Sequence, residues 1–450
     1  MLSSTVVKKN LEAACPAESM QVLLALKKAD FESYFAGGCV RDLLLGHAVH
    51  DFDVVTAATP EQVAQVFGVS KLVGSNFAVS LVKVGDVTTE VATMRLDGAY
   101  SDGRRPDNVE YTTNVKEDVA RRDFTVNALL LNEYGQVFDY VGGLQDLQNG
   151  YLRTVGDPVR RFTEDALRLM RLVRFAVKLN FELDPDTQVA AQQMAGSLAR
   201  LSGERLRDEL SKMLLGPRPD QAVDMLDRLG MFRYVLPEVC AMHGVDQNPA
   251  HHPEGDVYVH TLGLLSHLQP GSSLTLALAA LLHDVAKPVT AVRKPSTGQN
   301  TFHGHEDVGA EMADTVLRRL VFPNEVVDVV VSHVKQHMDF LQVRDMRRGK
   351  LARFVRQENF AELHELHRLD SLASGGTKMD SYNFVADFLN EVPAERLRPA
   401  RLVTGDDLVS MGLKPGPKFR ELLEAVETAQ LEGRLSTRDE ALELVKEMAR

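Results

Sequence analysis

The sequence has few cysteines, no long apolar run and a deficit of positive charge. Its three cysteines, Cys15, Cys39 and Cys240, lie far apart without paired spacing, which argues against a disulfide framework or a zinc knuckle and indicates a reducing compartment. The longest apolar run, Leu274 to Leu282, is too short to cross a bilayer. The opening residues contain no apolar signal core. We therefore expect a cytoplasmic protein without a membrane partner.

The acidic balance of charge restricts the class of partner. The chain has 51 Lys and Arg against 63 Asp and Glu, for a net charge of −12 with histidine neutral. A protein that coats nucleic acid without specificity is normally basic, so this class is disfavoured. Local basic clusters remain at Arg104–Arg105, Arg121–Arg122, Arg160 to Arg174 and Arg344 to Arg356. Each of them, taken alone, is typical of a solvated face.

The length and the hydrophobic pattern indicate several domains. A chain of 450 residues exceeds one ordinary core and suggests about three domains. Its 44% hydrophobic and 25% charged residues are typical of a soluble globular protein. From about residue 33 to 140, the β-rich runs FDVVT, AVSLVKV, TTEVATM, VEYTT and VFDYV alternate with helical stretches such as PEQVAQVF. This alternation predicts a small α/β domain.

The remainder of the chain has a helical period. The amphipathic segment TEDALRLMRLVRFAVKL predicts a helix that begins at a Thr163 cap and opens an all-helical domain. The loop QNPAHHPEGD separates this domain from a second helical block near residues 258–375. A charged helical tail follows, in which GLKPGPKF predicts a turn.

Two aspartates in DFDVVT form the first candidate site. The two-residue period of a strand predicts that Asp51 and Asp53 lie on one face. Paired carboxylates suit Mg²⁺, which keeps coordination positions for water and phosphates. The preceding Gly37 and Gly38 allow backbone N–H groups to approach a phosphate, and Glu90 in TTEVAT is a candidate third carboxylate. The alternative is a set of exposed acidic residues on ordinary strands.

Five motifs, in one order across roughly residues 35–215, carry a resemblance to a known family. They are GGCVRDLLLG with DFDVVT, DVARRDFTVNALLL, GLQDLQNGYLRTVG, EDALRLMR and GERLRDELSKML. Together they resemble the class II tRNA nucleotidyltransferase and bacterial poly(A) polymerase family, within the polymerase-β-like nucleotidyltransferases. In that family the motifs serve, in this order, catalysis, ribose recognition, the hinge, base selection and the bracing of the base-selecting helix.

The resemblance implies a role for each matching residue. Asp51, Asp53 and Glu90 are expected to be catalytic, and Asp51 and Asp53 to hold the Mg²⁺ ions that align an RNA 3′-hydroxyl with the α-phosphate. The base-selecting residues read the Watson–Crick edge, so that a wrong base leaves buried polar groups unpaired. Nucleotide binding is expected of Gly37, Gly38, Arg41, Arg122, Asp123, Asn127, Asp165, Arg168 and Arg171.

Two of these motifs also have plainer interpretations. Asp165 and Arg168 are three residues apart, a spacing typical of an ordinary helical ion pair. In the family, the same two residues form the protein template for the base. The stretch RRDF at Arg121, without the family, is compatible with a charged helix start.

The nucleotide that is added depends on a further stretch, MRLDGAYSDGRRPDNVEY at 94–111. It resembles the flexible loop that terminal A addition needs and that CC-only enzymes lack, with Arg95, Asp97, Arg104 and Arg105 as its candidate residues. The plainer interpretation is an exposed charged hairpin loop. The resemblance implies addition of CCA to tRNA from CTP and ATP, and A-only addition and poly(A) synthesis remain as alternatives. An alternative of another class is a tRNA-binding or regulatory protein with vestigial sites.

A second constellation lies at residues 260–370, around the His283–Asp284 pair of LLHDVAKP. It resembles the HD phosphohydrolase superfamily. The resemblance implies a metal site made of His260, His283, Asp284 and Asp370. Such ligands suit Mn, Ni, Co or Zn, and Mg²⁺ is the alternative. Auxiliary phosphate or second-metal ligands are expected at Lys287, His305, His333 and His337.

The activity implied for this second site is metal-dependent phosphohydrolysis, including that of 2′,3′-cyclic phosphates, and the alternative is a non-catalytic domain.

The predictions combine into an α+β multidomain protein. A polymerase-β-like nucleotidyltransferase α/β head is expected at 1–148, an all-helical neck for nucleotide selection and tRNA binding at 149–240, an HD domain at 241–375 and a helical tail at 376–450. Recognition of tRNA would rest on phosphate contacts and shape.

Overall fold

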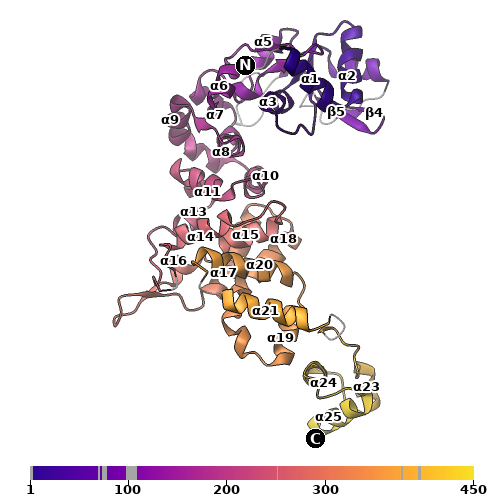
Figure 1. Ribbon diagram of the computed structural model, residues 1–450, viewed down its shortest axis with the longest axis vertical. Helices are drawn as coiled ribbons and strands as arrows, with labels where there is room; N and C mark the ends of the chain where they lie inside the picture. The colour runs from indigo at the N-terminus through magenta and orange to yellow at the C-terminus, as the bar shows by residue number, and fades with distance from the viewer. Residues whose placement is uncertain are drawn as a thin grey trace. The chain divides into compact units, whose positions relative to one another are not determined.

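The computed structural model describes residues 4–68, 71–72, 79–97, 109–250, 252–376, 379–393 and 397–449. The chain divides into two compact units, Met1–Pro237 and Glu238–Arg450. Figure 1 shows the large sheet within the first unit and helices through most of the rest. The predicted fold class, a mixed α/β head followed by helical domains, is confirmed. No helix in the described ranges is long and apolar enough to cross a bilayer.

The head is built on a seven-stranded sheet with the order β3-β4-β5-β2-β1-β8-β9. Of the strand pairs in this sheet, β2 and β5 are parallel and the others are antiparallel. A separate pair, β6 and β7, is also antiparallel. The strands are β1 (Ser33–Ala36), β2 (Val54–Thr56), β3 (Lys71–Leu72), β4 (Val79–Val84), β5 (Val87–Thr93), β6 (Arg95–Asp97), β7 (Val109–Tyr111), β8 (Leu130–Leu131) and β9 (Val137–Phe138).

The register of the central strands brings three chain segments to one edge of the sheet. Phe35 of β1 pairs with Val54 of β2, so the chain leaves β1 where it enters β2. Val54 in turn pairs with Val91 of β5. The loop after β1, the residue before β2 and Glu90 therefore lie side by side, although they are far apart in the sequence.

The predicted strand FDVVT is shorter than expected. The strand begins at Val54, and Asp51 and Asp53 lie in the preceding loop. The prediction that these two residues belong to the strand is therefore wrong, but the buried Phe52 between them keeps the alternating pattern of burial. Asp51 is exposed, whereas Asp53 is half-buried.

Helices cover the sheet and lead into the neck. The head helices are α1 (Ser4–Ala14), α2 (Ala17–Lys28), α3 (Gly38–Leu45), α4 (Pro60–Phe67), α5 (Val115–Ala120), the 3₁₀ turn η1 (Thr125–Asn127) and α6 (Gly143–Asn149). The neck contains α7 (Pro158–Glu164), α8 (Leu167–Leu179), α9 (Pro185–Met194), η2 (Ala195–Arg200), α10 (Gly203–Leu214), α11 (Pro219–Arg228), α12 (Phe232–Val235) and a short parallel pair, β10 (Tyr151–Leu152) with β11 (Glu182–Leu183).

The predicted helix from Thr163 is in fact two helices. Asp157 caps α7 by accepting a hydrogen bond from the Arg160 N–H at 2.6 Å, and Pro158 follows it, which is a favourable helix start. Thr163 lies inside α7 and its hydroxyl donates to the Val159 carbonyl oxygen. The Thr163 cap is therefore wrong. The chain extends at Asp165 before α8 begins, and the Asp165 carboxylate accepts a hydrogen bond from the Leu167 N–H at 3.0 Å, at the start of α8.

The second unit is helical. Its elements are α13 (Pro237–Cys240, at the division), α14 (Val257–Ser266), α15 (Leu274–Leu282), α16 (Lys287–Thr290), α17 (His305–Arg319), α18 (Asn324–Gln336), η3 (His337–Asp345), α19 (Arg348–Val355), α20 (Phe360–Ala373), α21 (Met379–Glu391), α23 (Gly405–Ser410), α24 (Pro417–Leu431), α25 (Arg438–Ala449) and the hairpin β12 (Val292–Arg293) with β13 (Asn300–Thr301).

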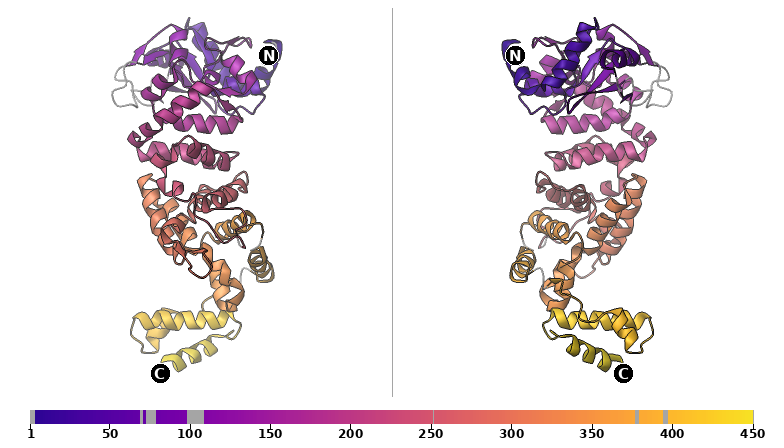
Figure 2. Two further views of the ribbon diagram at one scale, coloured as in Figure 1. Left: turned by 90° about the vertical axis from the view of Figure 1, so that its left-hand side faces the viewer. Right: turned by 90° about the vertical axis from the view of Figure 1, so that its right-hand side faces the viewer.

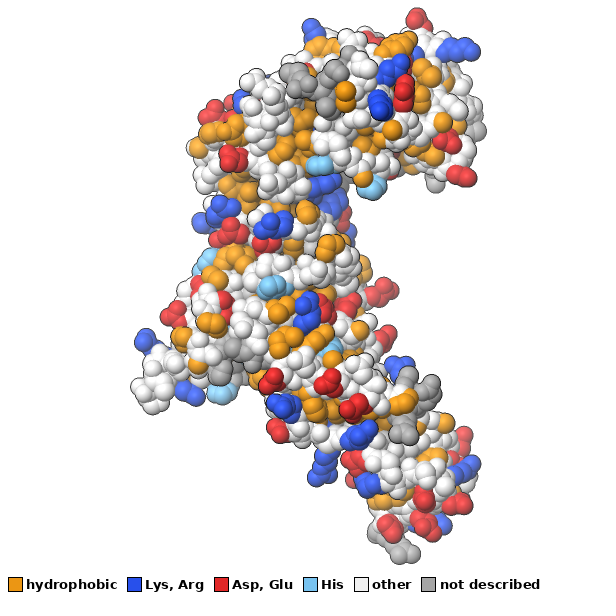
Figure 3. Space-filling model, in the orientation of Figure 1, with side chains coloured by type: hydrophobic (Ala, Val, Ile, Leu, Met, Phe, Trp, Pro, Cys, Tyr) orange, Lys and Arg blue, Asp and Glu red, His pale blue; other side chains and the backbone are white. Residues whose placement is uncertain are grey.

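The tail has a small core of its own, which includes Leu408, Leu422, Val426 and Val445. The turn expected at GLKPGPKF separates α23 from α24. Helices α24 and α25 lie side by side in both views of Figure 2. On the face seen in Figure 3, acidic and basic side chains are interspersed over this tail, so that face is not uniformly basic.

Candidate functional site

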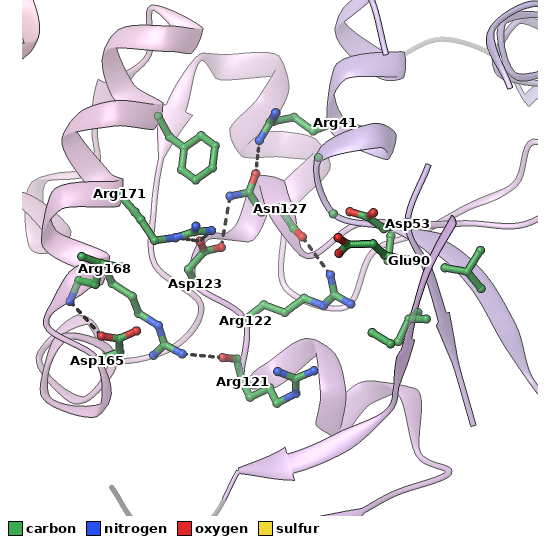
Figure 4. Close-up of a pocket in the computed structure, with 18 of the residues that line it drawn as sticks. Arg41, Asp53, Glu90, Arg121, Arg122, Asp123, Asn127, Asp165, Arg168 and Arg171 are labelled. Carbon is green, nitrogen blue, oxygen red and sulfur yellow. Dashed lines mark hydrogen bonds and ion pairs between the residues drawn. The ribbon is translucent and has the colours of Figure 1, made fainter. Parts of the chain in front are cut away.

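A pocket of about 600 Å³ lies in the first unit, between the head and the neck (Figure 4). Eleven of the predicted site residues line it: Gly37, Gly38, Arg41, Asp53, Glu90, Arg122, Asp123, Asn127, Asp165, Arg168 and Arg171. Asp51 is not among the lining residues. The pocket therefore places two of the predicted catalytic residues, Asp53 and Glu90, in one cavity with the predicted base-selecting residues, although Asp53 and Asp165 are more than a hundred positions apart in the sequence.

Asp53 and Glu90 face each other at the head side of the pocket (Figure 4). Burial, together with the charges of Glu90 and Asp51, raises the pKa of Asp53 to about 6, although Arg122 acts in the opposite direction. A bound divalent cation would relieve this repulsion between carboxylates. The two residues fit a magnesium site, and Asp51 is an exposed neighbour. The ligand atoms of these three described residues do not all converge within 4.8 Å.

The glycine loop after β1 lets the backbone enter the pocket. Gly37 has a φ of 80°, a left-handed conformation that favours glycine. A side chain there would also meet Arg122, whose Nη1 lies 3.6 Å from the position of an added Cβ. Helix α3 starts directly after this turn, so its first N–H groups are available to a phosphate.

A hydrogen-bonded chain of four side chains forms the back of the pocket (Figure 4). Arg171 donates to Asp123 through Nε at 2.9 Å and Nη2 at 2.5 Å. Asn127 donates to Asp123 at 3.2 Å and accepts from Arg41 at 2.5 Å. Burial would raise the pKa of Asp123, but the Arg171 guanidinium holds it below its ordinary value. Asp123 is therefore charged and links the head to α8.

Two arginines at the end of α5 are held by one buried carboxylate. Asp118 is fully buried and accepts hydrogen bonds from Arg121 and from Arg122, the latter at 3.0 Å. Burial would raise the pKa of Asp118, but Arg122 and Arg121 keep it below its ordinary value. RRDF therefore follows the end of a helix, and the interpretation as a charged helix start is wrong. Asp118 was not predicted, although its spacing of three and four residues from Arg121 and Arg122 could have indicated both contacts.

Asp165 and Arg168 line the pocket but do not pair with each other. Asp165 accepts from Arg205 of α10 at 3.0 and 2.9 Å. Arg168 donates to Glu164 at 2.8 Å and to the backbone carbonyl oxygens of Arg161 and Arg121, each at 3.0 Å. The ordinary ion pair between Asp165 and Arg168 is thus absent.

Sequence reasoning missed the partners of this base-selecting pair. The spacing of Glu164 and Arg168 at i, i+4 could have indicated their contact. Arg205 is 40 residues from Asp165, so only the fold reveals that contact. The same helix α10 also contacts α8 through Glu209, which accepts from Arg174 at 2.6 Å. This places the predicted bracing motif against the base-selecting helix.

The predicted flexible loop is described only at its base. Arg95 pairs with Tyr111 where β6 and β7 meet, and Asp97 ends β6. Arg104 and Arg105 lie outside the described residues. The Arg95 carbonyl oxygen accepts from Arg121 at 3.1 Å, so the base of the loop contacts one of the two arginines that Asp118 binds.

The second unit brings the predicted HD residues together. His260 of α14 has Nε2 at 3.2 Å from Asp370 Oδ1 and at 3.9 Å from Asp284 Oδ2. His283 Nε2 lies 3.2 Å from Asp284 Oδ2. The ligand atoms of His260, His283 and Asp370 all lie within 4.8 Å of one another.

The auxiliary residues divide into two groups. His305 and His337 form a second convergent group with Asp284, within 4.8 Å, and Lys287 Nζ lies 2.6 Å from Asp284 Oδ2. His333 lies elsewhere, because its Nε2 contacts Glu362 at 3.4 Å. Glu362 in turn accepts from Thr275 at 2.6 Å. The described contacts of His333 are therefore with a packing network between α15, α18 and α20.

The chemistry of the cluster fits a divalent transition metal. His260 Nε2, His283 Nε2 and both Asp284 oxygens are buried without a hydrogen bond of good geometry. Burial and the neighbouring His283 lower the pKa of His337 to about 3, so its ring is neutral. Burial would raise the pKa of Asp284, but His283 and Lys287 hold it well below its ordinary value. The neutral His337 ring and the unbonded imidazole nitrogens of His260 and His283, beside a charged carboxylate, are suitable ligands for such a metal.

Family models match three stretches of the chain. A model described as poly A polymerase head domain matches residues 33–153. One described as probable RNA and SrmB-binding site of polymerase A matches residues 180–242. The HD domain model matches residues 257–373.

Three relatives illustrate the similarity. A CCA-adding enzyme of Lactobacillus helveticus is 45% identical over 46% of this chain, and the chain spans about half of that relative, 51%. An A-adding tRNA nucleotidyltransferase of Deinococcus radiodurans is 35% identical over 92% of this chain and 94% of its own length. A CC-adding tRNA nucleotidyltransferase of Thermus thermophilus is 35% identical over 91% and 92%.

Solved structures show the same architecture. The CCA-adding enzyme of Bacillus stearothermophilus in complex with CTP has a TM-score of 0.73 at 27% identity, with 96% of each chain covered. The Thermotoga maritima CCA-adding enzyme complexed with tRNA shares the fold, with a TM-score of 0.62 at 20% identity over 99% of this chain and 98% of that one. The full-length matches at 35% identity establish that this chain belongs to the tRNA nucleotidyltransferase and poly(A) polymerase family, in the form that carries an HD domain.

Proposed function

We propose that the head and neck add CCA to the 3′ end of tRNA, without a nucleic-acid template, from CTP and ATP. The observation that carries this proposal is the single pocket that holds Asp53 and Glu90 together with Asp165 and Arg168. The family supports nucleotidyl transfer, and CCA addition is the activity named for relatives that match the head and for the structural neighbour with CTP. We place this activity in the cytoplasm.

Asp53 and Glu90, with Asp51 beside them, would hold Mg²⁺, which when bound aligns the RNA 3′-hydroxyl with the α-phosphate and neutralises the leaving pyrophosphate. Arg122 offers guanidinium N–H groups to the phosphates from beside the Gly37 turn. Asp123 and Asn127 are available for the ribose at the back of the pocket. The buried Asp118 keeps Arg122 in place without competing for the pocket.

The template for the base is the Asp165 and Arg168 pair. Cytosine and adenine both present an amino donor beside a ring-nitrogen acceptor on the Watson–Crick edge, whereas uracil and guanine present the reverse order. An acceptor carboxylate beside a donor guanidinium therefore suits C and A. Because Arg205 and Glu164 hold the two side chains separately, each can adjust to the size of the base.

The names of the relatives divide among CCA, A and CC addition, so the nucleotide specificity needs a direct test. Three tRNA transcripts, ending at the discriminator base, after C and after CC, are incubated with CTP, ATP or both. CCA addition predicts that all three reach the same length with both nucleotides. Growth only from the transcript ending in CC would replace the proposal with A addition. Long ladders with ATP on unrelated RNA would replace it with poly(A) synthesis.

We propose a second activity, metal-dependent phosphohydrolysis, for the HD unit. Its support is the cluster of His260, His283, Asp284 and Asp370, with Lys287 at the same Asp284 oxygen, Oδ2, and with His305 and His337 at Oδ1. A metal bound there would supply an activated water. Lys287 is placed to bind a phosphate oxygen beside the metal, and Gln247 orients its ammonium group at 2.7 Å.

Single variants separate these activities from a tRNA-binding or regulatory protein with vestigial sites. Asp53→Ala is expected to abolish nucleotide incorporation and to spare hydrolysis of a 2′,3′-cyclic phosphate, and His283→Ala to do the reverse. Normal RNA extension by Asp53→Ala would show that the head assignment is wrong. Hydrolysis by the wild type without nucleotide incorporation would instead favour a head that only presents RNA ends.

A further inference from the structure

The loop before α14 places one carboxylate against the outer nitrogen of His260. Glu254 Oε1 lies 2.6 Å from His260 Nδ1. We propose that Glu254 is a positioning residue, which sets the tautomer and orientation of His260 so that Nε2 is available to a metal. This inference rests on the HD metal site proposed above and names a residue outside the expected ligand set.

The geometry of His260 supports this role. Its ring is fully buried, with Nδ1 toward Glu254 and Nε2 at 3.2 Å from Asp370. An ionised carboxylate only accepts hydrogen bonds, so the Nδ1 that faces Glu254 carries the hydrogen. In the neutral ring the lone pair is then on Nε2, toward Asp370 and Asp284. Histidine ligands of metals are commonly fixed in this way by an outer carboxylate or carbonyl oxygen.

The other histidines of the cluster use the backbone for the same purpose. His283 Nδ1 lies 3.0 Å from the Ala280 carbonyl oxygen, His305 Nδ1 lies 2.7 Å from that of Phe302, and His337 Nδ1 lies 2.6 Å from that of Val334. All four rings thus direct Nε2 inward. His305 Nδ1 also lies 3.4 Å from Glu306 Oε2, but its nearer partner is the carbonyl oxygen. Among these four described residues, only His260 has a side chain as the nearest partner of Nδ1, so its tautomer can be altered by substitution.

The loop holds Glu254 firmly in this position. Asp256 caps α14 by accepting from the Val259 N–H at 2.9 Å, and its other oxygen accepts from the Gly244 N–H at 2.7 Å. His252 Nδ1 lies 3.0 Å from the same Glu254 Oε1. Because the loop is tied at both sides, the carboxylate is oriented before any metal binds.

A different role for the same atoms is a metal site made of His252, Glu254 and His260, whose ligand atoms also lie within 4.8 Å. In that case His260 would bind the ion through Nδ1. Its Nε2 would carry the hydrogen, and the inner cluster would lose a ligand. The two roles therefore predict different effects of His252.

The test measures Ni²⁺ affinity by calorimetry on the full chain after chelator treatment. His283→Ala identifies the heat that belongs to the inner cluster. Glu254→Gln is expected to weaken this binding by about 10- to 100-fold, because the amide can donate to Nδ1 and favour the wrong tautomer. Glu254→Ala is expected to weaken it at least as much. Glu311→Gln, an exposed glutamate on α17, is the matched control and should bind as the wild type does.

Three further outcomes are decisive. The melting temperature of Glu254→Gln in chelator should equal that of the wild type, and the visible spectrum of its Co²⁺ form should differ from that of the wild type. If Glu254 were only structural, its substitution would lower the melting temperature and leave the Co²⁺ spectrum unchanged. His252→Ala should keep its affinity, and a loss as large as that of Glu254→Gln would overturn the positioning role in favour of the outer site. If the wild type and His283→Ala bind alike, the HD metal proposal itself fails. If only Glu254→Gln equals the wild type, the role of Glu254 alone fails.

Discussion

Arg205 binds both carboxylate oxygens of Asp165 through one guanidinium nitrogen, at 3.0 and 2.9 Å. This contact joins α10 to the residue between α7 and α8, and it sets the direction in which Asp165 enters the pocket. Asp165 is 21% exposed, so the ion pair is only partly screened by water. Arg205 therefore orients Asp165, one of the two residues of the proposed base template, although Arg205 lies outside the motif EDALRLMR that contains Asp165.

Removal of this contact should relax base selection. Arg205→Ala is expected to lower kcat/KM for CTP and ATP by about tenfold or more, because Asp165 loses its fixed orientation, while UTP is affected less. Single-nucleotide incorporation with the four triphosphates measures the effect. Arg207→Ala on the same helix is the control, since its guanidinium pairs with Asp208. Equal losses for all four triphosphates would contradict a role in selection.

Phe175 should support nucleotide affinity without contacting the reacting atoms. Three guanidinium groups, those of Arg41, Arg171 and Arg174, lie 5.1, 5.2 and 4.2 Å from its ring centroid. Phe175→Leu retains an apolar side chain but loses these interactions, each worth about 0.5–1 kcal/mol. The three interactions together amount to about 1.5–3 kcal/mol, so we expect KM for CTP and ATP to rise by about tenfold or more, with kcat nearly unchanged. Phe181→Leu is the control, and a fall in kcat alone would contradict this account.

Asp118 should stabilise the head in a pH-dependent manner. Its pKa in the folded protein lies below the ordinary value of 3.8. The stabilisation is therefore complete above that pH and is lost as the pH falls through the folded pKa. Asp118→Asn leaves two arginines without their buried partner and should lower the free energy of unfolding by about 3 kcal/mol at neutral pH.

Urea unfolding of Asp118→Asn and of the wild type, at pH 7, 5 and 3, tests this dependence. The difference between the two proteins should be the same at pH 7 and 5 and smaller at pH 3. A difference that persists unchanged at pH 3 would show that the ion pairs are not its source.

Substitution of His333 and of His337 should have different effects on metal binding, although the motif SHVKQHM alone does not distinguish the two residues. His337→Ala removes a ring from the Asp284 group and should weaken metal binding by more than about tenfold. His333→Ala should leave metal affinity unchanged and lower the melting temperature, because it removes the partner of Glu362. Calorimetry with Ni²⁺ and thermal unfolding measure the two effects. A loss of affinity in His333→Ala would restore it to the metal site.

The sequence by itself determined the family and the fold class, and it supplied the candidate residues for both sites. Motifs such as DFDVVT, EDALRLMR and LLHDVAKP have local spacings that the chemistry requires, so they can be recognised without a structure. The helix PEQVAQVF and the strands within AVSLVKV and TTEVATM also follow from local pattern, and they are confirmed.

The tertiary structure decided which residues work together. Asp51 does not line the pocket, whereas Asp53 does, and Asp165 accepts hydrogen bonds from Arg205 instead of Arg168. The place of His333 among packing residues and the contact of Glu254 with His260 also depend on the fold. These relationships join atoms from elements that are distant in the sequence or depend on backbone direction. The spacing of residues within a motif gives no information on contacts between distant elements or on the direction of the backbone, because the packing of helices and strands sets both.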